Sequence, residues 1–442
     1  MKIGYDRNSS DNTKGLHDTK KGFHLSVMLY KLEVLVLVLL FMTSLPGAGA
    51  QTTHRLPRRK LIEFGWNSPT PTILRDCLAQ IEKSPFDGTA IRLPEAAGGG
   101  HIFDVNKWAT TRPEDREHEA RILASLPKSA QLTDNFLVIH ATSTMDWFRD
   151  ADWVKAEEHL RWCARMAKAA GCRGVFWDPE PYNGFNLWHH PSLPGSDKRP
   201  FTTSYQQVRK RGAQFIRALQ QEFPSLTVIS LRQLSDFQKG SPFSAGLLPV
   251  RDPERVEKEL AGAYWGLHVA FTNGILDAIA PGVTFVDGNE DAYFYTSALN
   301  FYRVYHTLKR DALALVAPEN RAKYAAQFQV GHAVSVDYTS GRWGDKIGSF
   351  PDYLRKQARE LTYEQQAQWF EHNVFHALQS TDAYVWVYAE DLNWWEGRNI
   401  PSGFAEALAS AKRKHETGEP LGFDVEPMLV ETQQRLKAQT KK

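Results

Sequence analysis

The chain has 442 residues, of which 53 are Lys or Arg and 51 are Asp or Glu, so its formal net charge is only +2. This near balance argues against a broad nucleic-acid-binding surface, and a content of 42% hydrophobic and 24% charged residues excludes a disordered or fibrous chain. The chain also carries 13 Trp, whose flat apolar rings suit sugar stacking as well as core filling.

The first 50 residues read as a leader rather than as part of the fold. The nine apolar residues of 34–42 are followed by Ala48-Gly49-Ala50, the small-x-small pattern of a signal-peptidase site. An apolar run of this length is too short to span a bilayer. We therefore expect cleavage near Ala50, a true start at Met28, and a secreted or periplasmic protein with no stable membrane span. A retained membrane anchor is the alternative.

From Gln51 onward, β-rich runs alternate with amphipathic helical runs, and this order predicts a parallel α/β sheet. The eight runs are 60–66, 86–93, 135–141, 172–178, 226–234, 283–289, 327–334 and 383–390. Eight strands predict a (β/α)8 TIM barrel with long βα loops as a single domain over 51–420. Residues 421–442 are expected to form a polar helix or tail, and the insertion at 235–281 to hold extra helices.

Three helices between these runs can be read directly from the sequence. Apolar residues from Trp153 to Ala170 step by three and four before Gly171. A second helix opens at Ser204 and ends before Pro224, and a third begins with the capping-box pair Thr362 and Gln365. The cysteines are expected to be buried free thiols, because their number is odd and no CxxC or Cys/His spacing suggests zinc. They are Cys77, Cys163 and Cys172.

Two carboxylates, Asp178 and Glu180, end the fourth run, and each is followed by a proline. Residues two apart in a strand point to the same face at a spacing of about 6.6 Å, so the two acids project together. Pro179 lacks an N–H and marks the carboxyl end of the strand, which is the active-site rim of a barrel. Two such carboxyls do not ionise independently, so one can act as an acid while the other stays anionic, as in glycosidic bond cleavage. Alternatively, they cap a loop or pair with Arg173 or Arg232.

The last run ends in a second group of candidate residues. Alternation places Glu390 at the rim, above an inward-facing set of Tyr384, Trp386 and Tyr388. Trp394 and Trp395 follow on the loop, where two exposed indoles are costly unless they stack on a partner such as a pyranose ring. The alternatives are a hydrophobic lid for the two Trp and an ion pair for Glu390.

The sixth run adds Asp287, Glu290 and Asp291 near another strand end. A carboxylate across the barrel from Glu180 would act as nucleophile at about 5 Å or activate a water at about 6.5 to 9.5 Å. We therefore take Glu390, Asp287 and Glu290 as candidates for this partner. A calcium loop is the rival interpretation of 287–291, although the remaining ligand spacing is absent.

Aromatic and histidine side chains near the predicted strand ends are candidates for binding the sugar. They are Trp66, His140, Trp177, Tyr182, Trp188, Tyr293, Trp386, Tyr388, Trp394 and Trp395, with Trp343 as a further stacking candidate. The loop 183–196 follows the two acids directly and is expected to form a wall on the substrate side. A place in the core is the alternative for Trp66, His140 and Trp343, and Glu63 is either an interior acid or an ion-pair partner.

With these residues in place, the chain resembles secreted barrel glycoside hydrolases over most of 60–400. The Asp178-Pro179-Glu180 sequence is similar to the D-x-E that ends the fourth strand of chitinase-like hydrolases. That resemblance implies that Glu180 is the acid and that Asp178 assists an acetamido group of the substrate. The chain has Arg173 and Phe176 where that family carries further Asp residues.

The leading hypothesis is a glycoside hydrolase acting on an extracellular poly- or oligosaccharide, with Glu180 as general acid/base and Asp178 tuning it. No metal or organic cofactor and no nucleic acid is expected to take part, and the oligomeric state is open. Two alternatives remain. One is a non-catalytic carbohydrate-binding barrel, and the other is a metal-dependent hydrolase built on the acids with His140 and His332.

Overall fold

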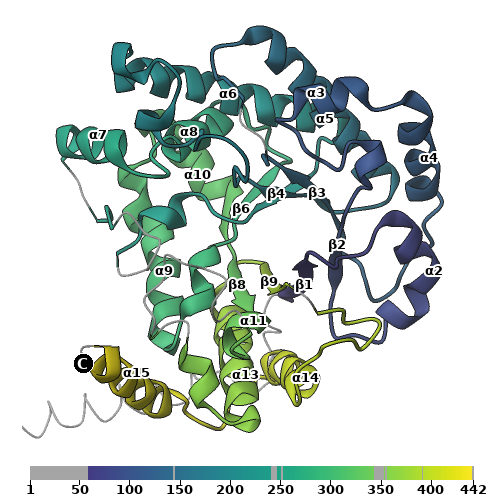
Figure 1. Cartoon of the computed structure of the whole chain (residues 1–442), viewed down its shortest axis with the longest axis vertical. Helices are drawn as coiled ribbons and strands as arrows, with labels where there is room; N and C mark the ends of the chain where they lie inside the picture. The colour runs from purple at the N-terminus through teal and green to yellow at the C-terminus, as the bar shows by residue number, and fades with distance from the viewer. Residues whose placement is uncertain are drawn as a thin grey trace, which may run out of the picture. The chain divides into compact units, whose positions relative to one another are not determined.

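A parallel sheet lies at the centre of the chain in the computed structural model, surrounded by helices (Figure 1). The structure describes residues 58–142, 145–239, 246–249, 252–342, 353, 356–390 and 392–440. The expected leader and Trp343 lie outside these residues. Within them the strands are β1 (Lys60–Gly65), β2 (Gly88–Ile91), β3 (Phe136–His140), β4 (Gly174–Asp178), β5 (Thr227–Ser230), β6 (Thr284–Asp287), β7 (Phe328–Val330), β8 (His332–Ser335) and β9 (Tyr384–Ala389).

The strands follow each other around the sheet in the order β7-β6-β5-β4-β3-β2-β1-β9-β8, and neighbouring strands in this order pair in parallel. Its two edges, β7 and β8, are consecutive in the chain and are separated only by Gly331. The run 328–335 therefore pairs with β6 through its first half and with β9 through its second half. This run brings the two edges together, so the sheet forms a nearly closed barrel and the predicted TIM barrel is confirmed.

Side chains alternate between the barrel interior and the surrounding helices, as a period of two requires. In β9, Tyr384, Trp386 and Tyr388 pack with the interior cluster, whereas Val385 and Val387 pack with the outer core. The interior cluster also receives Phe64, Phe136 and Phe176 from β1, β3 and β4. The barrel is thus filled with aromatic rings beneath the carboxyl ends of its strands, and these rings support the side chains above them.

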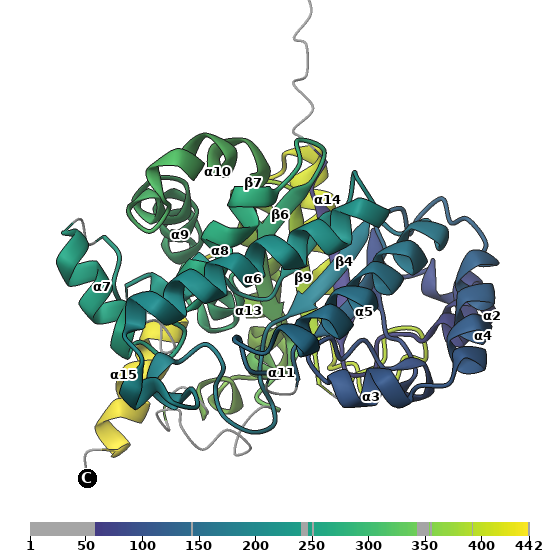
Figure 2. The same ribbon diagram turned by 90° about the horizontal axis from the view of Figure 1, so that it is seen from above.

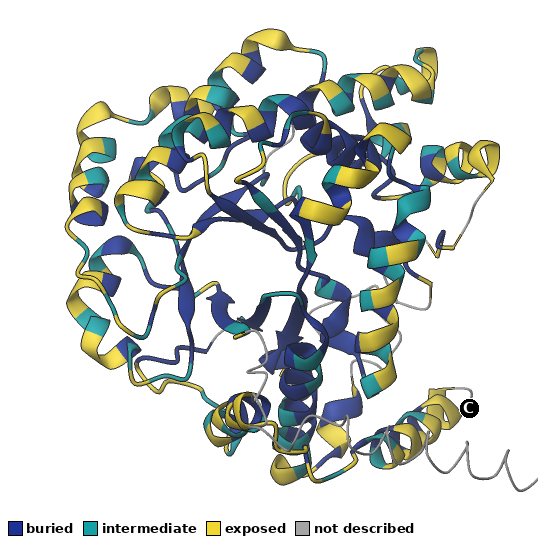
Figure 3. Ribbon diagram, turned by 180° about the vertical axis from the view of Figure 1, so that it is seen from behind, coloured by how far each residue is buried: buried dark blue, intermediate teal, exposed yellow. Residues whose placement is uncertain are grey.

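The helices cover the outside of the barrel, with their inner faces buried and their outer faces exposed (Figure 3). The first half contributes α2 (Pro71–Ile81), α3 (Val105–Thr110), α4 (Pro113–Ala124), α5 (Asp150–Ala169) and α6 (Phe201–Glu222). The second half contributes α7 (Pro253–Gly262), α8 (His268–Ala278), α9 (Ala298–Arg310), α10 (Arg321–Gln327), α11 (Val336–Thr339), α13 (Tyr363–Ser380), α14 (Phe404–Thr417) and α15 (Glu426–Thr440). The long helices α5 and α6 run side by side along one wall (Figure 2).

Several local expectations are met in these helices. Both bonds of the capping box are present at the start of α13, where Gln365 N–H donates to the Thr362 hydroxyl and Thr362 N–H donates to the Gln365 side chain. The insertion at 235–281 holds α7 and α8, and α15 forms the polar C-terminal helix. The three cysteines are free thiols; Cys163 and Cys172 are buried as expected, whereas Cys77 is only partly buried. Among the described helices, none has both the length and the apolar character needed to cross a membrane.

Candidate active site

A cavity of about 290 Å³ opens at the carboxyl ends of the strands. The loops that follow β1, β2, β4, β5, β6 and β9 all contribute to it, which is the position that barrel enzymes use for chemistry. Its lining consists of Phe64, Gly65, Trp66, Arg92, Val138, His140, Asp178, Glu180, Tyr182, Leu231, Glu290, Tyr293, Tyr388 and Glu390. Acids that are distant in the sequence therefore meet in one hollow.

Asp178 and Glu180 are joined by a short network at the end of β4. The Tyr182 hydroxyl lies 2.9 Å from Asp178 Oδ2 and 2.9 Å from Glu180 Oε2. Asp178 is buried, and its Oδ1 accepts the backbone N–H of Glu180 at 2.9 Å. The Glu180 side chain keeps 27% of its surface exposed. Asp178 thus anchors the loop, while Glu180 is the member of the pair that can reach a bound molecule.

Glu290 lies opposite Glu180 at the start of the 3-10 helix η5 (Glu290–Phe294), and Arg232 links the two acids. Arg232 Nη2 contacts Glu290 Oε2 and lies 3.4 Å from Glu180 Oε1, and its Nε donates to Glu290 at 2.8 Å. Two oxygens that contact one nitrogen through hydrogen-bond-length contacts lie within roughly 6 Å of each other. The carboxyl groups of Glu180 and Glu290 are therefore close neighbours.

The surroundings of Glu180 and Glu290 shift the pKa values of both carboxyl groups. Burial raises the pKa of Glu180 and raises that of Glu290 to about 8, while Arg232 favours ionisation of both. The charge of Asp178 opposes ionisation of both acids, and the charge of Glu180 also opposes ionisation of Glu290. Such a pair titrates as a unit. Arg232 contacts Glu290 through two nitrogens and Glu180 through only one, so it favours the anionic form of Glu290 more strongly than that of Glu180.

Glu390 reaches the same cavity from the end of β9. The Tyr388 hydroxyl donates to Glu390 Oε2, and the Glu390 backbone N–H donates to the Asp337 carboxylate from α11. Tyr293 lies beside Tyr388, with ring centroids 5.4 Å apart. Glu390 is therefore held at the cavity wall by its backbone and by a phenol, and no cation of the described residues forms an ion pair with its side chain.

Trp66 and Tyr182 form the mouth of the cavity. Their rings meet edge to face with centroids 5.9 Å apart, and they keep 42% and 45% of their surface exposed. Arg92, which follows β2, lies with its guanidinium carbon 4.7 Å from the centre of the Trp66 ring. Two exposed aromatic rings beside a cavity that also holds carboxylates suit an apolar sugar face.

His140 ends β3 and lines the floor of the cavity. Its Nδ1 lies 3.5 Å from Asp178 Oδ2, and its ring stacks on that of His101 with centroids 5.3 Å apart. Burial lowers the pKa of His140, although the carboxylate of Asp178 opposes this. The His140 imidazole is therefore favoured in its neutral form beside the carboxylate of Asp178.

Several predicted site residues do not line the cavity. Asp287 is buried and accepts the Ser235 hydroxyl at 2.6 Å and the Ser235 N–H at 2.8 Å, so its carboxylate holds the loop after β5. Trp386 lies deeper in the barrel, where its indole N–H donates to Gly288 O at 2.8 Å. The remaining indoles pack in the outer core: Trp177, Trp188, Trp394 and Trp395. These four therefore support the walls and do not present stacking faces to the cavity.

The sequence interpretation did not assign Arg92 to the site and named Arg232 only as a pairing alternative. Arg92 and Arg232 lie inside the predicted runs 86–93 and 226–234, whereas in the structure they follow the ends of β2 and β5 by one and two residues. Their place near the carboxyl ends of those runs was the available signal. Glu63 is an interior acid, bonded to Thr89 at 2.6 Å and to Ser68 at 3.1 Å. Burial raises its pKa to about 8. Glu63 lies within β1 and is not part of the cavity lining.

No group of three or more His, Cys, Asp or Glu side chains suited to a metal ion occurs in the part of the chain that the structure describes. His332, proposed as a metal ligand in the third hypothesis, is buried in β8. Its ring contacts the Asn289 side chain at 2.9 Å and the Ser380 hydroxyl at 3.1 Å. His332 and His140 therefore have separate sets of contacts.

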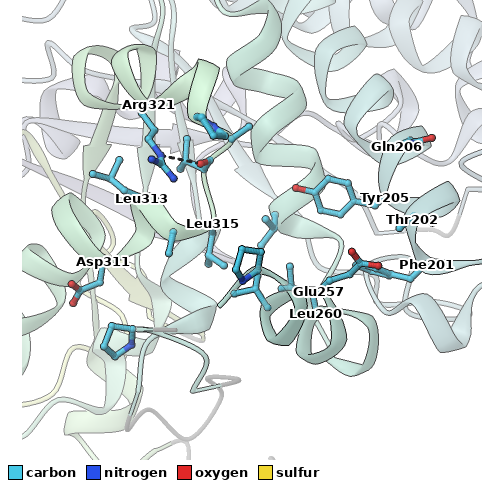
Figure 4. A pocket seen from close by; sticks show the side chains of 18 of the residues that line it. Phe201, Thr202, Tyr205, Gln206, Glu257, Leu260, Asp311, Leu313, Leu315 and Arg321 are labelled. Atoms are coloured by element: carbon cyan, nitrogen blue, oxygen red, sulfur yellow. Dashed lines mark hydrogen bonds between the residues drawn. The ribbon is translucent and has the colours of Figure 1, made fainter. Parts of the chain in front are cut away.

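A larger cavity of about 750 Å³ lies outside the barrel wall, between α6, α7, α8 and the segment 310–321 (Figure 4). Its lining is largely apolar, including Phe201, Leu260 and Leu315. Arg321 lies at its edge and donates to Val316 O at 3.4 Å (Figure 4). Because the acid cluster lies inside the barrel mouth, we place the chemistry in the smaller cavity.

Solved structures with a similar fold include several barrel enzymes. A GH18 chitinase from Pseudoalteromonas aurantia is 10% identical with a TM-score of 0.35, covering 80% of this chain and 99% of the other. A GH5-4 broad specificity endoglucanase from an uncultured bacterium is 11% identical with a TM-score of 0.38, covering 77% and 84%. A sugar phosphate isomerase/epimerase from Parabacteroides distasonis is 12% identical with a TM-score of 0.35, covering 83% and 99%.

No protein-family model and no curated protein matches the sequence. The structural similarities above are distant and include enzymes of different reaction classes. Similarity at this level carries no conclusion about chemistry. The function must therefore be argued from the cavity and its side chains.

Proposed function

We propose that this protein hydrolyses glycosidic bonds of an extracellular poly- or oligosaccharide in the cavity at the barrel mouth. The observation that carries the proposal is the pair Glu180 and Glu290, which both approach one Arg232 nitrogen in a cavity that the exposed rings of Trp66 and Tyr182 also line. A carboxylic acid next to a carboxylate in a buried site is the equipment of glycoside hydrolysis.

Glu180 acts as the general acid, because it keeps the shared proton and is partly exposed toward the cavity. It donates this proton to the glycosidic oxygen as the bond to the anomeric carbon breaks. Asp178 and Tyr182 orient Glu180 through the phenol that contacts both carboxylates. Asp178 is therefore assigned as a positioning group.

Glu290 is assigned as the nucleophile. Retaining enzymes place their two carboxyl groups about 5 to 5.5 Å apart, and inverting enzymes leave about 6.5 to 9.5 Å for a water. The shared Arg232 nitrogen holds the oxygens of Glu180 and Glu290 within roughly 6 Å, which favours retention. Glu290 would form an ester with the anomeric carbon, and a water activated by Glu180 would then hydrolyse that ester.

The test is turnover of a panel of aryl glycosides and natural polysaccharides by wild type, Glu180→Gln and Glu290→Ala. We expect each variant to lose about 10³-fold or more in kcat. Azide added to Glu290→Ala should restore turnover and give a glycosyl azide of inverted configuration, because azide replaces the missing nucleophile. The exposed Glu396, which pairs with Arg398, provides a matched control, and Glu396→Gln should retain wild-type rates.

Other results would assign the roles differently. Azide rescue of Glu390→Ala, with none for Glu290→Ala, would move the nucleophile to the β9 end. Binding of glycans by wild type with no product from any substrate would instead identify a carbohydrate-binding barrel, in which Arg232 serves only to neutralise the acids.

A further inference from the structure

Arg92 differs from the other charged groups of the cavity because its charge has no role in the proposed acid/base chemistry. Arginine stays protonated in proteins and so neither gives nor takes a proton. Its side chain nevertheless lines the cavity in which Glu180 and Glu290 lie. A permanent cation placed there contributes through the binding of anions or of electron-rich groups.

The contacts of Arg92 leave most of its hydrogen-bonding capacity open. Its Nη1 donates to Trp66 O at 3.0 Å, and its guanidinium lies over the Trp66 ring. In the described part of the chain, no carboxylate lies within ion-pair distance of it. Arginine offers five N–H donors in a planar fork, so four of them remain for a ligand.

The acids around Arg92 already have donors of their own. Asp178 accepts from Tyr182 and from the Glu180 N–H, and Glu390 accepts from Tyr388. Burial lowers the pKa of Arg92, with the charge of Asp178 opposing this, so an anion brought to the guanidinium would be bound in partly desolvated surroundings. Charge-assisted bonds to a planar fork are the strongest that a side chain offers to an anionic group.

We propose that the cavity selects sugars that carry an anionic substituent, a carboxylate or a sulfate ester, and that Arg92 binds this substituent beside the Trp66 ring. The proposal rests on the assigned function in one respect, that the ligand of the cavity is a sugar. Trp66 would contact the sugar ring through the face that Arg92 leaves uncovered, while the guanidinium takes the anion.

The experiment measures binding, so that it does not depend on turnover. Each protein carries Glu180→Gln to prevent cleavage, and Trp fluorescence and calorimetry follow titration with glucose, glucuronate and sulfated-glucose oligosaccharides of equal length. We expect one anionic series to bind about 10- to 100-fold more tightly than the neutral one. The carboxylate and sulfate arms identify which anion the site takes.

Arg92→Gln should bring the ratio of anionic to neutral affinity to about one, and Arg92→Lys should retain only part of the preference, because an ammonium lacks the planar fork. The matched control is Arg75→Gln, since Arg75 is an exposed arginine of α2 paired with Asp76; it should keep the full preference. Melting midpoints of all variants verify folding.

Equal or tighter binding of the neutral series, no binding of any series, or an anion preference that survives Arg92→Gln would overturn the inference. A loss of neutral and anionic binding together in folded Arg92→Gln would also overturn it, because Arg92 would then serve only to hold Trp66. Hydrolysis of neutral glycans alone would leave the proposed function intact while removing this inference. If the unmodified protein turned over no substrate but still bound anions in an Arg92-dependent way, this inference would stand and the proposed function would fall.

Discussion

Arg232 contacts acidic side chains from three separate segments of the chain. Its Nη2 approaches Glu180 and Glu290, and its Nη1 lies 3.5 Å from Asp236 in the 3-10 helix η4 (Leu234–Phe237). The ring of Trp265 lies 4.8 Å from its guanidinium carbon. A buried cation shared in this way determines which of its carboxylates stays ionised.

Replacing Arg232 by Gln should therefore change the pH dependence of catalysis. Without the cation the anionic form of Glu290 is less stable, so its pKa rises further. Since the proposed mechanism needs ionised Glu290, the acidic limb of the kcat/KM profile should move upward by about one to three pH units. The measurement is kcat/KM from pH 4 to pH 9 on an aryl glycoside.

The control for this prediction is Arg165→Gln, which removes an arginine that pairs with Glu222 on the outer helices. Its pH profile should match that of the wild type. If Arg232→Gln lowers the rate equally at every pH, then Arg232 contributes position alone and the assignment of the anion to Glu290 fails.

At the scale of elements, the seventh strand shows how one residue allows the sheet to close. The sequence predicts a single strand over 327–334, and the structure divides it at Gly331 into β7 and β8. A side chain at Gly331 would place its Cβ 3.0 Å from Val286 Cγ1 in β6 and 3.1 Å from Tyr384 O in β9. The two neighbouring strands therefore approach this glycine more closely than they approach most β-carbons.

Gly331→Ala should destabilise the barrel by about 1–2 kcal/mol, because either the strand or its neighbours must move by a few tenths of an ångström. Urea unfolding measures this change through the midpoint at constant slope. Gly262→Ala is the matched control: Gly262 ends α7 with nothing within 4 Å of the added carbon, so stability should stay level or rise slightly. A Gly331→Ala protein as stable as the wild type would show that the break in the strand has another cause.

At the scale of the whole molecule, the sequence predicts the strands and the acids at their carboxyl ends. It does not predict which aromatic side chains of the loops are exposed. Alternation in β9 places Glu390 at the cavity, and the proline after Asp178 marks the end of β4. Trp394 instead packs against Phe86 with ring centroids 5.3 Å apart, because the loop after β9 folds back over the outer core. The side on which this loop packs depends on tertiary contacts, which the local sequence does not reveal.

The acids of the sixth run show the same limit. Asp287 continues the strand alternation, yet its carboxylate is bound by Ser235 from a neighbouring loop, whereas Glu290 enters the cavity because η5 turns the chain inward. The pairing of Glu290 with Arg232 joins residues 58 positions apart. From a single sequence, such acids can be compared only by their spacing from predicted strand ends. The sequence therefore gives a few candidates for the acid that faces Glu180 and cannot choose among them.

The leader expected over residues 1–50 lies outside the described residues, and it yields a separate prediction. Small residues at Ala48 and Ala50 fit the pocket of a signal peptidase, and the nine-residue apolar run before them is too short to remain as a span. We expect protein exported by a host that recognises this leader to begin at Gln51 on N-terminal sequencing. Ala50→Arg should block processing, while Gln51→Ala should leave it unchanged. Exported wild-type protein that keeps residues 34–42 would contradict cleavage and favour an anchor.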